Sequence, residues 1–192
     1  DTDASGQAVF LVTANASTQT NGRSLSVYSA VVTNQGNLSL AAMPNVTIIA
    51  AGPSAANSTA TSAVGTVAAG TGTSITVTAR DAFMNLVPSV AVSGVSDRGD
   101  SVSPASAPTN ALGIAAFSVG STVSGVSNYT FTVGGVTIAA VPAVATVPGA
   151  PNAANSSITL STATSQAGDN VSATVEVRDG FSNVVPGVNA SL

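Results

Sequence analysis

The sequence predicts an all-β fold of tandem β-sandwiches, and its composition, its alternating segments and an internal repeat all indicate this fold. The 192 residues are 44% hydrophobic but only 4% aromatic, so Ala and Val provide most of the apolar content. Val and Thr favour strands, whereas the 18 Gly and 9 Pro favour turns. We therefore expect many short strands that are joined by tight turns.

An internal repeat organises the chain. The pattern Arg-Asp-x-Phe-x-Asn-x-Val-Pro at 80–88 returns at 178–186, which is 98 positions later. A second pattern, Thr-x-Ala-x-Gly-x-Ala-x-Phe, occurs at 2–10 and again at 109–117. Such self-similarity at a fixed period is the signature of repeat architectures. We predict three parts: the C-terminal part of one repeat at 1–52, a complete repeat at 53–150 and the N-terminal part of the next repeat at 151–192.

Alternating apolar residues predict the strands of the complete repeat in chain order. Residues 74–79 place Ile75, Val77 and Ala79 on one face, because successive side chains of a strand point to opposite sides. Gly134-Gly135 predicts a hairpin turn, since Gly readily adopts the positive φ values of such turns. The same alternation predicts further inward rows at Val90 and Val92; at Ala115, Phe117 and Val119; at Tyr129, Phe131 and Val133; and at Val136 and Ile138.

Short strands and turns across about 100 residues are typical of an immunoglobulin-like sandwich. The first 52 residues supply the later strands of such a unit, which we predict at 8–12, 25–32 and 38–49. The predicted fold class is therefore all-β: tandem immunoglobulin-like β-sandwiches, with one complete repeat flanked by two partial repeats.

The Thr-x-Ala-x-Gly-x-Ala-x-Phe run resembles the signature of bacterial immunoglobulin-like group 1 domains, known from invasin and intimin stalks, and of filamin-type repeats. That family joins two early strands by an Asp-x-x-Gly-Asn-Pro-like turn, and residues 81–85 and 179–183 occupy its place. This sequence departs from the pattern by placing Phe near the expected small turn residues. The resemblance covers nearly the whole chain and implies the repeats of a large surface glycoprotein, but it implies no binding site.

The residues that most often carry catalysis are missing. The chain contains no His, no Cys and no Lys, so Ser-His, Cys-His and Ser-Lys arrangements are excluded. Asp81 and Asp179 belong to equivalent turns of different repeats, so they are too far apart to act as the carboxylate pair of a glycosidase. We predict that the protein is not an enzyme and has no catalytic residues and no cofactor.

The repeated Arg-Asp pairs at 80–81 and 178–179 could suggest calcium sites, with Asp97 and Asp100 as further candidate ligands. Calcium takes six to eight oxygen ligands, several of them from carboxylates, and this chain has only eight acidic residues. We therefore predict no metal site. The favoured interpretation is a structural turn, in which Asp accepts hydrogen bonds from backbone amides and Arg braces the turn; its residues are Asp81, Asn85, Asp179 and Asn183.

One short recognition motif is present, Arg98-Gly99-Asp100. It resembles the integrin-binding tripeptide that certain sandwich domains present on an exposed loop. The surrounding residues also fit an ordinary loop of these repeats. An adhesion loop and a structural loop therefore both stay open for Arg98, Gly99 and Asp100.

Asn-x-Ser/Thr triplets are frequent, and eight of the fourteen Asn begin one. Ser and Thr make up 50 of the 192 residues, so chance alone predicts roughly four such triplets. Charged residues are only 6% of the chain, which favours a secreted glycoprotein whose sugars supply the solubility that charge does not. The candidate glycosylation sites are Asn15, Asn37, Asn45, Asn57, Asn128, Asn155, Asn170 and Asn189.

The net charge of −4 and the lack of a basic cluster argue against nucleic acid and anionic membranes as partners. The apolar stretch 136–147 contains Pro142 and is shorter than the ~20 residues of a spanning helix, so we predict no direct membrane insertion here. An extracellular or cell-surface location follows. The expected partners are neighbouring repeats or copies of the chain, together with other surface or extracellular proteins.

Three functions are compatible with these observations. The leading one is a structural, non-catalytic repeat region of an extracellular stalk, coat or fibre glycoprotein. The second is a self-assembling filament subunit, in which 151–192 of one chain and 1–52 of the next complete each other by strand addition. The third is an adhesin module that uses the Arg98-Gly99-Asp100 loop.

Overall fold

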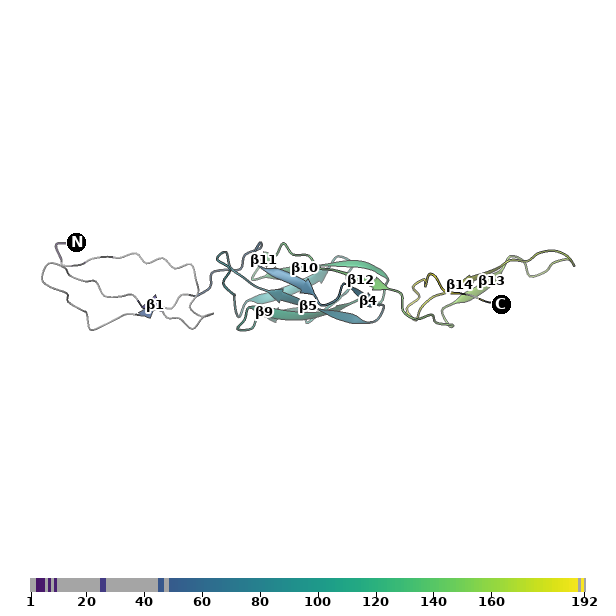
Figure 1. Cartoon of the computed structure of the whole chain (residues 1–192), viewed down its shortest axis with the longest axis horizontal. Coiled ribbons are helices and arrows are strands. Elements are labelled where there is room, and N and C mark those ends of the chain that lie inside the picture. Colours follow the sequence, from purple (N-terminus) through teal and green to yellow (C-terminus); the bar gives the residue numbers. More distant parts are fainter. Residues whose placement is uncertain are drawn as a thin grey trace.

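The structure is a computed structural model and describes residues 3–5, 7, 9, 25–26, 45–46, 49–189 and 191. Apart from Val9, the strand predicted at 8–12 lies outside the described residues, as do most of the residues predicted as strands at 25–32 and 38–49. Within the described part, strands β1 (Leu25–Ser26) and β2 (Asn45–Val46) form an antiparallel pair. The described residues contain strands and turns but no helix, which confirms the all-β prediction for them (Figure 1).

The complete repeat is a sandwich of two sheets. The first sheet has the strand order β3-β5-β9-β7, and the second has the order β4-β12-β10-β6-β8, with β11 paired to β10. All pairings are antiparallel except β4 with β12, which is parallel. The strands are β3 (Thr59–Ser62), β4 (Thr66–Ala68), β5 (Gly72–Thr78), β6 (Ala91–Ser96), β7 (Ser101–Ser103), β8 (Ser106–Pro108), β9 (Ile114–Gly120), β10 (Gly125–Val133), β11 (Val136–Thr137) and β12 (Ala143–Val147).

The core of this repeat lies between the two sheets and is formed by most of the predicted inward rows, whereas Val90 and Val136 are only half-buried. The side chains of β5, β9 and β10 alternate between buried and exposed, as the sequence predicts. The rings of Phe117 on β9 and Phe131 on β10 face each other across the core, with centroids 5.1 Å apart. Each such buried apolar side chain contributes roughly 1.5–3 kcal/mol to folding. The fully buried residues include Ile75, Val77, Val92, Val119, Tyr129 and Val133.

The predicted hairpin at Gly134-Gly135 is confirmed. It joins β10 to β11, and both glycines have positive φ values, 55° and 83°. Two successive positive φ values match the twist of the flanking strands, which is why glycine is favoured at both positions.

The Thr-x-Ala-x-Gly run has a structural cause in the complete repeat. The buried hydroxyl of Thr109 donates to the Val87 carbonyl (2.7 Å) and accepts from the Val90 amide (3.1 Å), so it ties the segment before β6 to the turn between β8 and β9. Gly113 has a φ of 69°, and a Cβ there would lie 2.9 Å from the Ala79 carbonyl oxygen. Close backbone contacts therefore explain why threonine occupies position 109 and glycine occupies position 113.

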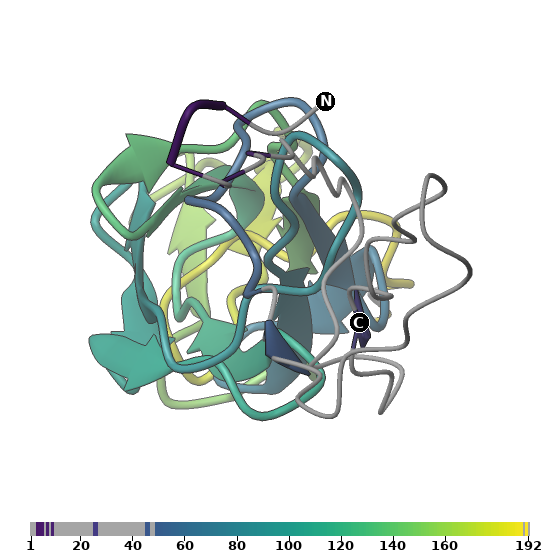
Figure 2. The ribbon, with the colours of Figure 1, turned by 90° about the vertical axis from the view of Figure 1, so that its left-hand side faces the viewer.

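The following partial repeat continues beyond β12 along the long axis of the molecule (Figure 1). Figure 2 views the molecule along this axis, from the opposite end of the chain. Strands β13 (Ser157–Leu160) and β14 (Ala173–Glu176) form an antiparallel pair, equivalent to β3 and the second half of β5. Their apolar residues Ile158, Leu160 and Val175 are exposed, because no second sheet covers them in the described part of this repeat.

Candidate functional site: the joint between repeats

Two equivalent turns, 81–85 and 179–183, are built in the same way. In the second turn, Oδ1 of Asp179 accepts from the amides of Phe181 and Asn183, both at 2.8 Å. The fourth residue, Ser182, has a positive φ of 68°, as has Met84 (66°) in the first turn. Oδ1 of Asp81 likewise accepts from amides two and four residues later. An aspartate that bonds to nearby amides in this way stabilises a tight turn.

An arginine closes each turn from outside. Nη1 of Arg80 donates to the Met84 carbonyl at 2.7 Å, and Nη1 of Arg178 donates to the Ser182 carbonyl at 2.6 Å. Arg178 also pairs with Glu176, the only ion pair among the described residues. The Arg-Asp pairs of the sequence are therefore parts of a turn.

A preceding asparagine also holds each turn. Nδ2 of Asn57 donates to the Asp81 carbonyl at 2.9 Å, and Nδ2 of Asn155 donates to the Asp179 carbonyl at 2.7 Å. Both asparagines are half-buried. The next residue contributes too, since the hydroxyl of Ser58 bonds to the main chain of Arg80.

The second carboxylate oxygen of each aspartate binds the segment that enters the repeat. Oδ2 of Asp81 accepts from the Ala51 amide at 2.9 Å, and Oδ2 of Asp179 accepts from the Gly149 amide at 2.8 Å. Gly149 lies in the linker 148–150 that connects β12 to the next repeat. Both aspartates are completely shielded from solvent. Each carboxylate thus fastens the turn and the linker together.

Asn183 joins the two repeats directly. Its Nδ2 donates to Oδ2 of Asp179 within its own turn and to the Thr122 carbonyl of the complete repeat, both at 2.8 Å. Its Oδ1 accepts from the Ser124 amide, also at 2.8 Å. Only 8% of Asn183 is exposed. One amide side chain therefore uses both of its ends to bind the loop 121–124 of the preceding repeat.

Phe181 packs against the preceding repeat beside this amide. Its ring lies so close to Gly70 that a Cβ on this glycine would be 2.3 Å from Cζ of Phe181. Gly70 also has a positive φ of 80°, and its amide donates to the Ser121 carbonyl. The inter-repeat joint is defined here by the turn 179–183, the linker 148–150, Gly70 and the loop 121–124.

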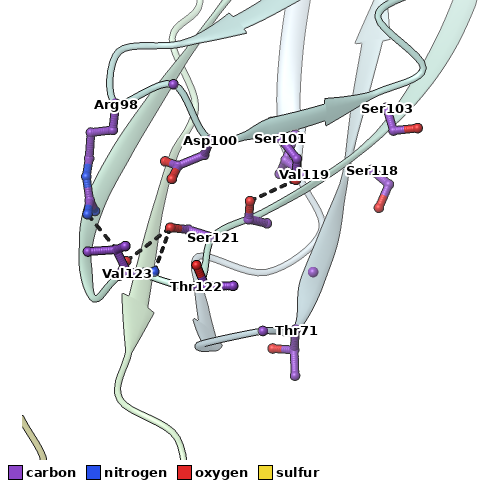
Figure 3. A pocket seen from close by; sticks show the side chains of 14 residues that line it. Thr71, Arg98, Asp100, Ser101, Ser103, Ser118, Val119, Ser121, Thr122 and Val123 are labelled. Carbon is purple, nitrogen blue, oxygen red and sulfur yellow. Dashed lines mark hydrogen bonds between the residues drawn. The ribbon is translucent and has the colours of Figure 1, made fainter. Parts of the chain in front are cut away.

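Arg98 supports the loop 121–124 from the other side (Figure 3). Its Nη2 donates to the carbonyls of Val123 (3.3 Å) and Ser124 (3.2 Å). Gly125 leaves room for the guanidinium, because a Cβ there would lie 2.5 Å from Nη1 of Arg98. Arg98 and the loop border an open groove of about 560 Å³.

Asp100 turns toward its own repeat. Its Oδ2 accepts from the hydroxyl of Ser96 at 3.1 Å and from the hydroxyl of Ser127, and the residue is half-buried. In the candidate adhesion loop of Arg98, Gly99 and Asp100, neither charged side chain is therefore free of the framework. Both charged side chains bind groups of the complete repeat.

The turn aspartates are held as anions. Burial alone would raise the pKa of Asp179, but hydrogen bonds from the side chain of Asn183 and from three backbone amides lower this pKa to about 2. Burial and the corresponding bonds around Asp81 act in the same way, and its pKa also lies below the usual value. A carboxylate that accepts several hydrogen bonds is stabilised in its charged form.

The described residues contain no group of three or more His, Cys, Asp or Glu side chains that could hold a metal ion. Asp81 and Asp179 lie in separate turns, and neither approaches Asp97 or Asp100 in a shared cluster. In the described part of the chain we also find no helix of the length and apolarity needed to cross a membrane.

The candidate glycosylation sites fall into different environments. Asn57 and Asn155 hold the turns, whereas Asn128, Asn170 and Asn189 are exposed. Asn45 lies on β2, and Asn15 and Asn37 lie outside the described residues.

Sequence reasoning found the turn residues of the joint but not the surface they bind. Thr122, Ser124 and Gly149 contribute backbone groups, which leave no side-chain signal in the sequence. The Ala-Gly pair at 69–70 recurs at 167–168, which places Gly70 in the repeat but does not mark it as part of the joint.

Comparison with known proteins supports the fold. No family model and no curated protein matches the chain. Among solved structures, the chain is similar to invasin, a bacterial integrin-binding protein, with a TM-score of 0.60 and 20% identity over 77% of this chain and 31% of that one. It is also similar to InvD of Yersinia pseudotuberculosis (TM-score 0.57, 22% identity, 79% of this chain and 49% of that one).

A third similar structure is the Escherichia coli adhesin FdeC, with a TM-score of 0.54 and 22% identity over 80% of this chain and 50% of that one. The chain thus spans half or less of the length of these solved structures. At this level of identity the comparison establishes the fold. The chain has the immunoglobulin-like β-sandwich fold that these solved structures also have.

Proposed function

We propose that this chain is a non-catalytic part of an extracellular stalk, in which immunoglobulin-like repeats are held end to end by fixed joints. The observation that carries the proposal is Asn183, whose side chain bonds to the loop 121–124 of the preceding repeat at both ends. The division of the chain at residues 53 and 151 belongs to this proposal, with 53–150 as the complete unit.

The joint is suited to transmit orientation from one repeat to the next. Neighbouring domains move relative to each other by default unless their interface is substantial. Here the linker amide of Gly149 is bound by Asp179, and Phe181 fits over Gly70. A rotation about the linker would break buried hydrogen bonds of about 0.5–1.5 kcal/mol each and leave their partners unsatisfied.

A surface location and a stalk role agree with the similar structures, which are adhesins or an integrin-binding protein of bacteria. The chain also lacks His, Cys and Lys, which favours a structural role over catalysis. The partners that we propose are the neighbouring repeats and other surface or extracellular proteins.

The loop of Arg98, Gly99 and Asp100 serves the joint in this proposal. Arg98 supports the carbonyls of the loop 121–124, and Asp100 binds two serine hydroxyls of its own repeat. An integrin-type ligand would require both charged groups to leave these contacts. We therefore expect Asp100→Glu to leave cell attachment unchanged, and a loss of attachment would favour the adhesin alternative.

Hydrogen exchange of single amides tests the joint. In the wild-type chain the Ser124 amide is expected to exchange slowly, because it donates to Asn183. Asn183→Ala removes this acceptor, and a loss of about 1 kcal/mol corresponds to roughly fivefold faster exchange. The measurement is amide exchange by NMR on the full 192-residue chain.

Asn85→Ala is the matched control, because it makes the same change in the equivalent turn without touching Ser124. Exchange at Ser124 should stay at the wild-type rate in this variant. Equal rates in the wild type and in Asn183→Ala would contradict the fixed joint.

A filament subunit is the second candidate, and the sequence pattern shared by residues 2–10 and 109–117 favours it. In the complete repeat, β5 pairs with β9 through contacts such as Ile75 with Phe117. Residues 2–10 repeat the pattern found at 109–117, so Phe10 of a second copy is the counterpart of Phe117. Strand addition to a sheet edge is a known mode of assembly. Sedimentation velocity should then show concentration-dependent oligomers that Phe10→Asp abolishes; a monomer at every concentration would exclude this candidate.

A further inference from the structure

The outer face of the six-stranded sheet carries exposed valines among Ser, Thr and Asn side chains. None of its strands, β4, β6, β8, β10, β11 and β12, contains a charged residue. Val95 on β6 and Val126 on β10 are 64% and 57% exposed. Ala145, which pairs with Val126 on the neighbouring strand β12, extends the same surface. These three residues, named here the valine face, form a small apolar surface that a neighbouring group can cover.

A sequon lies within the valine face. Asn128, Tyr129 and Thr130 are consecutive residues of β10, and Tyr129 points into the core with 1% exposure. Side chains alternate along a strand, so Asn128 and Thr130 point outward on the same side as Val126. Asn128 pairs with Ala143 and Thr130 pairs with Val95, so the sequon lies between the apolar residues.

Asn128 is held in an orientation that leaves its amide nitrogen available. Its backbone amide donates to Oδ1 of Asp97 at 2.9 Å, and its Nδ2 donates to Oδ2 of the same carboxylate at 2.8 Å. A side-chain amide has two hydrogens on Nδ2. One hydrogen serves Asp97, and the other can be replaced by a bond to a sugar while the side chain keeps its position.

The sequons of Asn57 and Asn155 differ from that of Asn128 in the exposure of the asparagine and in the contacts of its side chain. Nδ2 of Asn57 and Nδ2 of Asn155 reach main-chain carbonyls of the turns and are half-buried beside them. The middle residues of these sequons, Ser58 and Ser156, also bind the main chain of the turns. The Asn-Ser pairs therefore have a structural cause that is independent of glycosylation.

We propose that Asn128 carries an N-linked oligosaccharide that covers the valine face, whereas Asn57 and Asn155 remain unmodified. The proposal rests on the extracellular location proposed above. The sugar donor is a lipid-linked oligosaccharide diphosphate. A bond forms between Nδ2 of Asn128 and the anomeric carbon of the first sugar, the bond from this carbon to the diphosphate oxygen breaks, the lipid diphosphate leaves with the electron pair, and Nδ2 loses one proton to the transferase.

Substitution of the third sequon residue separates the glycan from the role of the asparagine. The full chain is secreted from an animal cell line, and each site is mapped by mass spectrometry before and after enzymatic deglycosylation. Thr130→Ala should remove one glycan mass while Asn128 and its bonds to Asp97 stay in place. Thr130→Ser keeps the sequon and should keep the glycan.

The matched controls are Thr59→Ala and Ser157→Ala, which remove the sequons of Asn57 and Asn155. Neither should change the mass of the secreted chain beyond the substitution itself. Thr130→Ala should also increase self-association in sedimentation, because it uncovers the valine face. An unmodified Asn128, or a glycan on Asn57 or Asn155, would overturn the proposal.

This outcome is separable from that of the stalk proposal. The hydrogen exchange of Ser124 is measured on chain without glycans, so a mobile joint would refute the stalk and leave the occupancy of Asn128 intact. A fixed joint with an unmodified Asn128 would refute only the glycan.

Discussion

At the scale of single residues, Asn183 and Asp179 share one task. Asp179 binds the linker and its own turn, and Asn183 binds Asp179 and the preceding repeat. Their side chains form a continuous chain of hydrogen bonds from Gly149 to Thr122. Networks of this kind in a shielded site are strong when complete and costly when one member is removed.

Gly70→Ala tests the contact with Phe181. The new Cβ would lie 2.3 Å from the ring and would require a positive φ that alanine disfavours by about 1–2 kcal/mol. We expect a lower thermal midpoint and a displaced joint, measured by calorimetry and by chemical shifts of the loop 121–124.

Gly168→Ala is the control for backbone strain. Gly168 is the equivalent glycine of the next repeat, with a φ of 100° and no atom within 4 Å of the position that a Cβ would take. The Gly168→Ala variant should lower the thermal midpoint through its positive φ alone, and the chemical shifts of the loop 121–124 should not change. Similar shifts of this loop in both variants would contradict a specific contact between Gly70 and Phe181.

The pH dependence of the joint follows from Asp179. Its pKa is lowered from 3.8 to about 2 in the folded chain, so the folded state favours the anion. The resulting stabilisation is fully present above about pH 4 and is lost as the pH falls through about 2. Protection of the Gly149 amide should fall over this window, and Asp179→Asn should remove the dependence. Protection of the Gly149 amide that stays constant down to pH 2 would contradict the role given to the Asp179 carboxylate.

At the scale of strands, Gly94 on β6 shows how the sheet accommodates its core. Gly94 pairs with Phe131 on β10, and a Cβ there would lie 2.5 Å from the Phe131 ring. The glycine thus makes space for the aromatic side chain.

Gly94→Ala should destabilise the complete repeat by about 1–3 kcal/mol, the usual cost of overpacking a core. Chemical denaturation measures this change. Gly94→Ala combined with Phe131→Leu should recover part of the loss, because leucine is smaller than the ring. A neutral Gly94→Ala would show that Phe131 can move aside.

Strand alternation was sufficient to predict β5, β9 and β10, because each is long enough to show two or three inward residues. The three-residue strands β4, β7 and β8 carry too few side chains for a pattern. The parallel pairing of β4 with β12 depends on tertiary packing and could not be predicted from local sequence.

The same limit applies to the joint. The repeated Asp and Asn predicted its turns, since their side chains make the bonds. Their partners Thr122 and Ser124 act through the backbone, so any residue type could stand there. Of the aromatic residues, Phe117 and Phe131 were correctly predicted as core, and Phe181 remains 50% exposed while it packs against Gly70.

At the scale of the whole molecule, the complete repeat and the partial repeat that follows it lie along a single axis (Figure 1). A stalk extends in proportion to its number of repeats only if each joint keeps its angle. We therefore propose that Asp179, Phe181 and Asn183 fix the inter-repeat joint, so that the linker 148–150 is not a flexible tether.

Pulsed electron resonance between two spin labels measures this directly. The chain has no Cys, so Ala116→Cys on β9 and Thr159→Cys on β13 provide two unique exposed labelling sites in adjacent repeats. A fixed joint should give one narrow distance distribution for the labelled chain and a broader one when Asn183→Ala is added. A broad distance distribution in the chain that retains Asn183 would contradict a fixed joint.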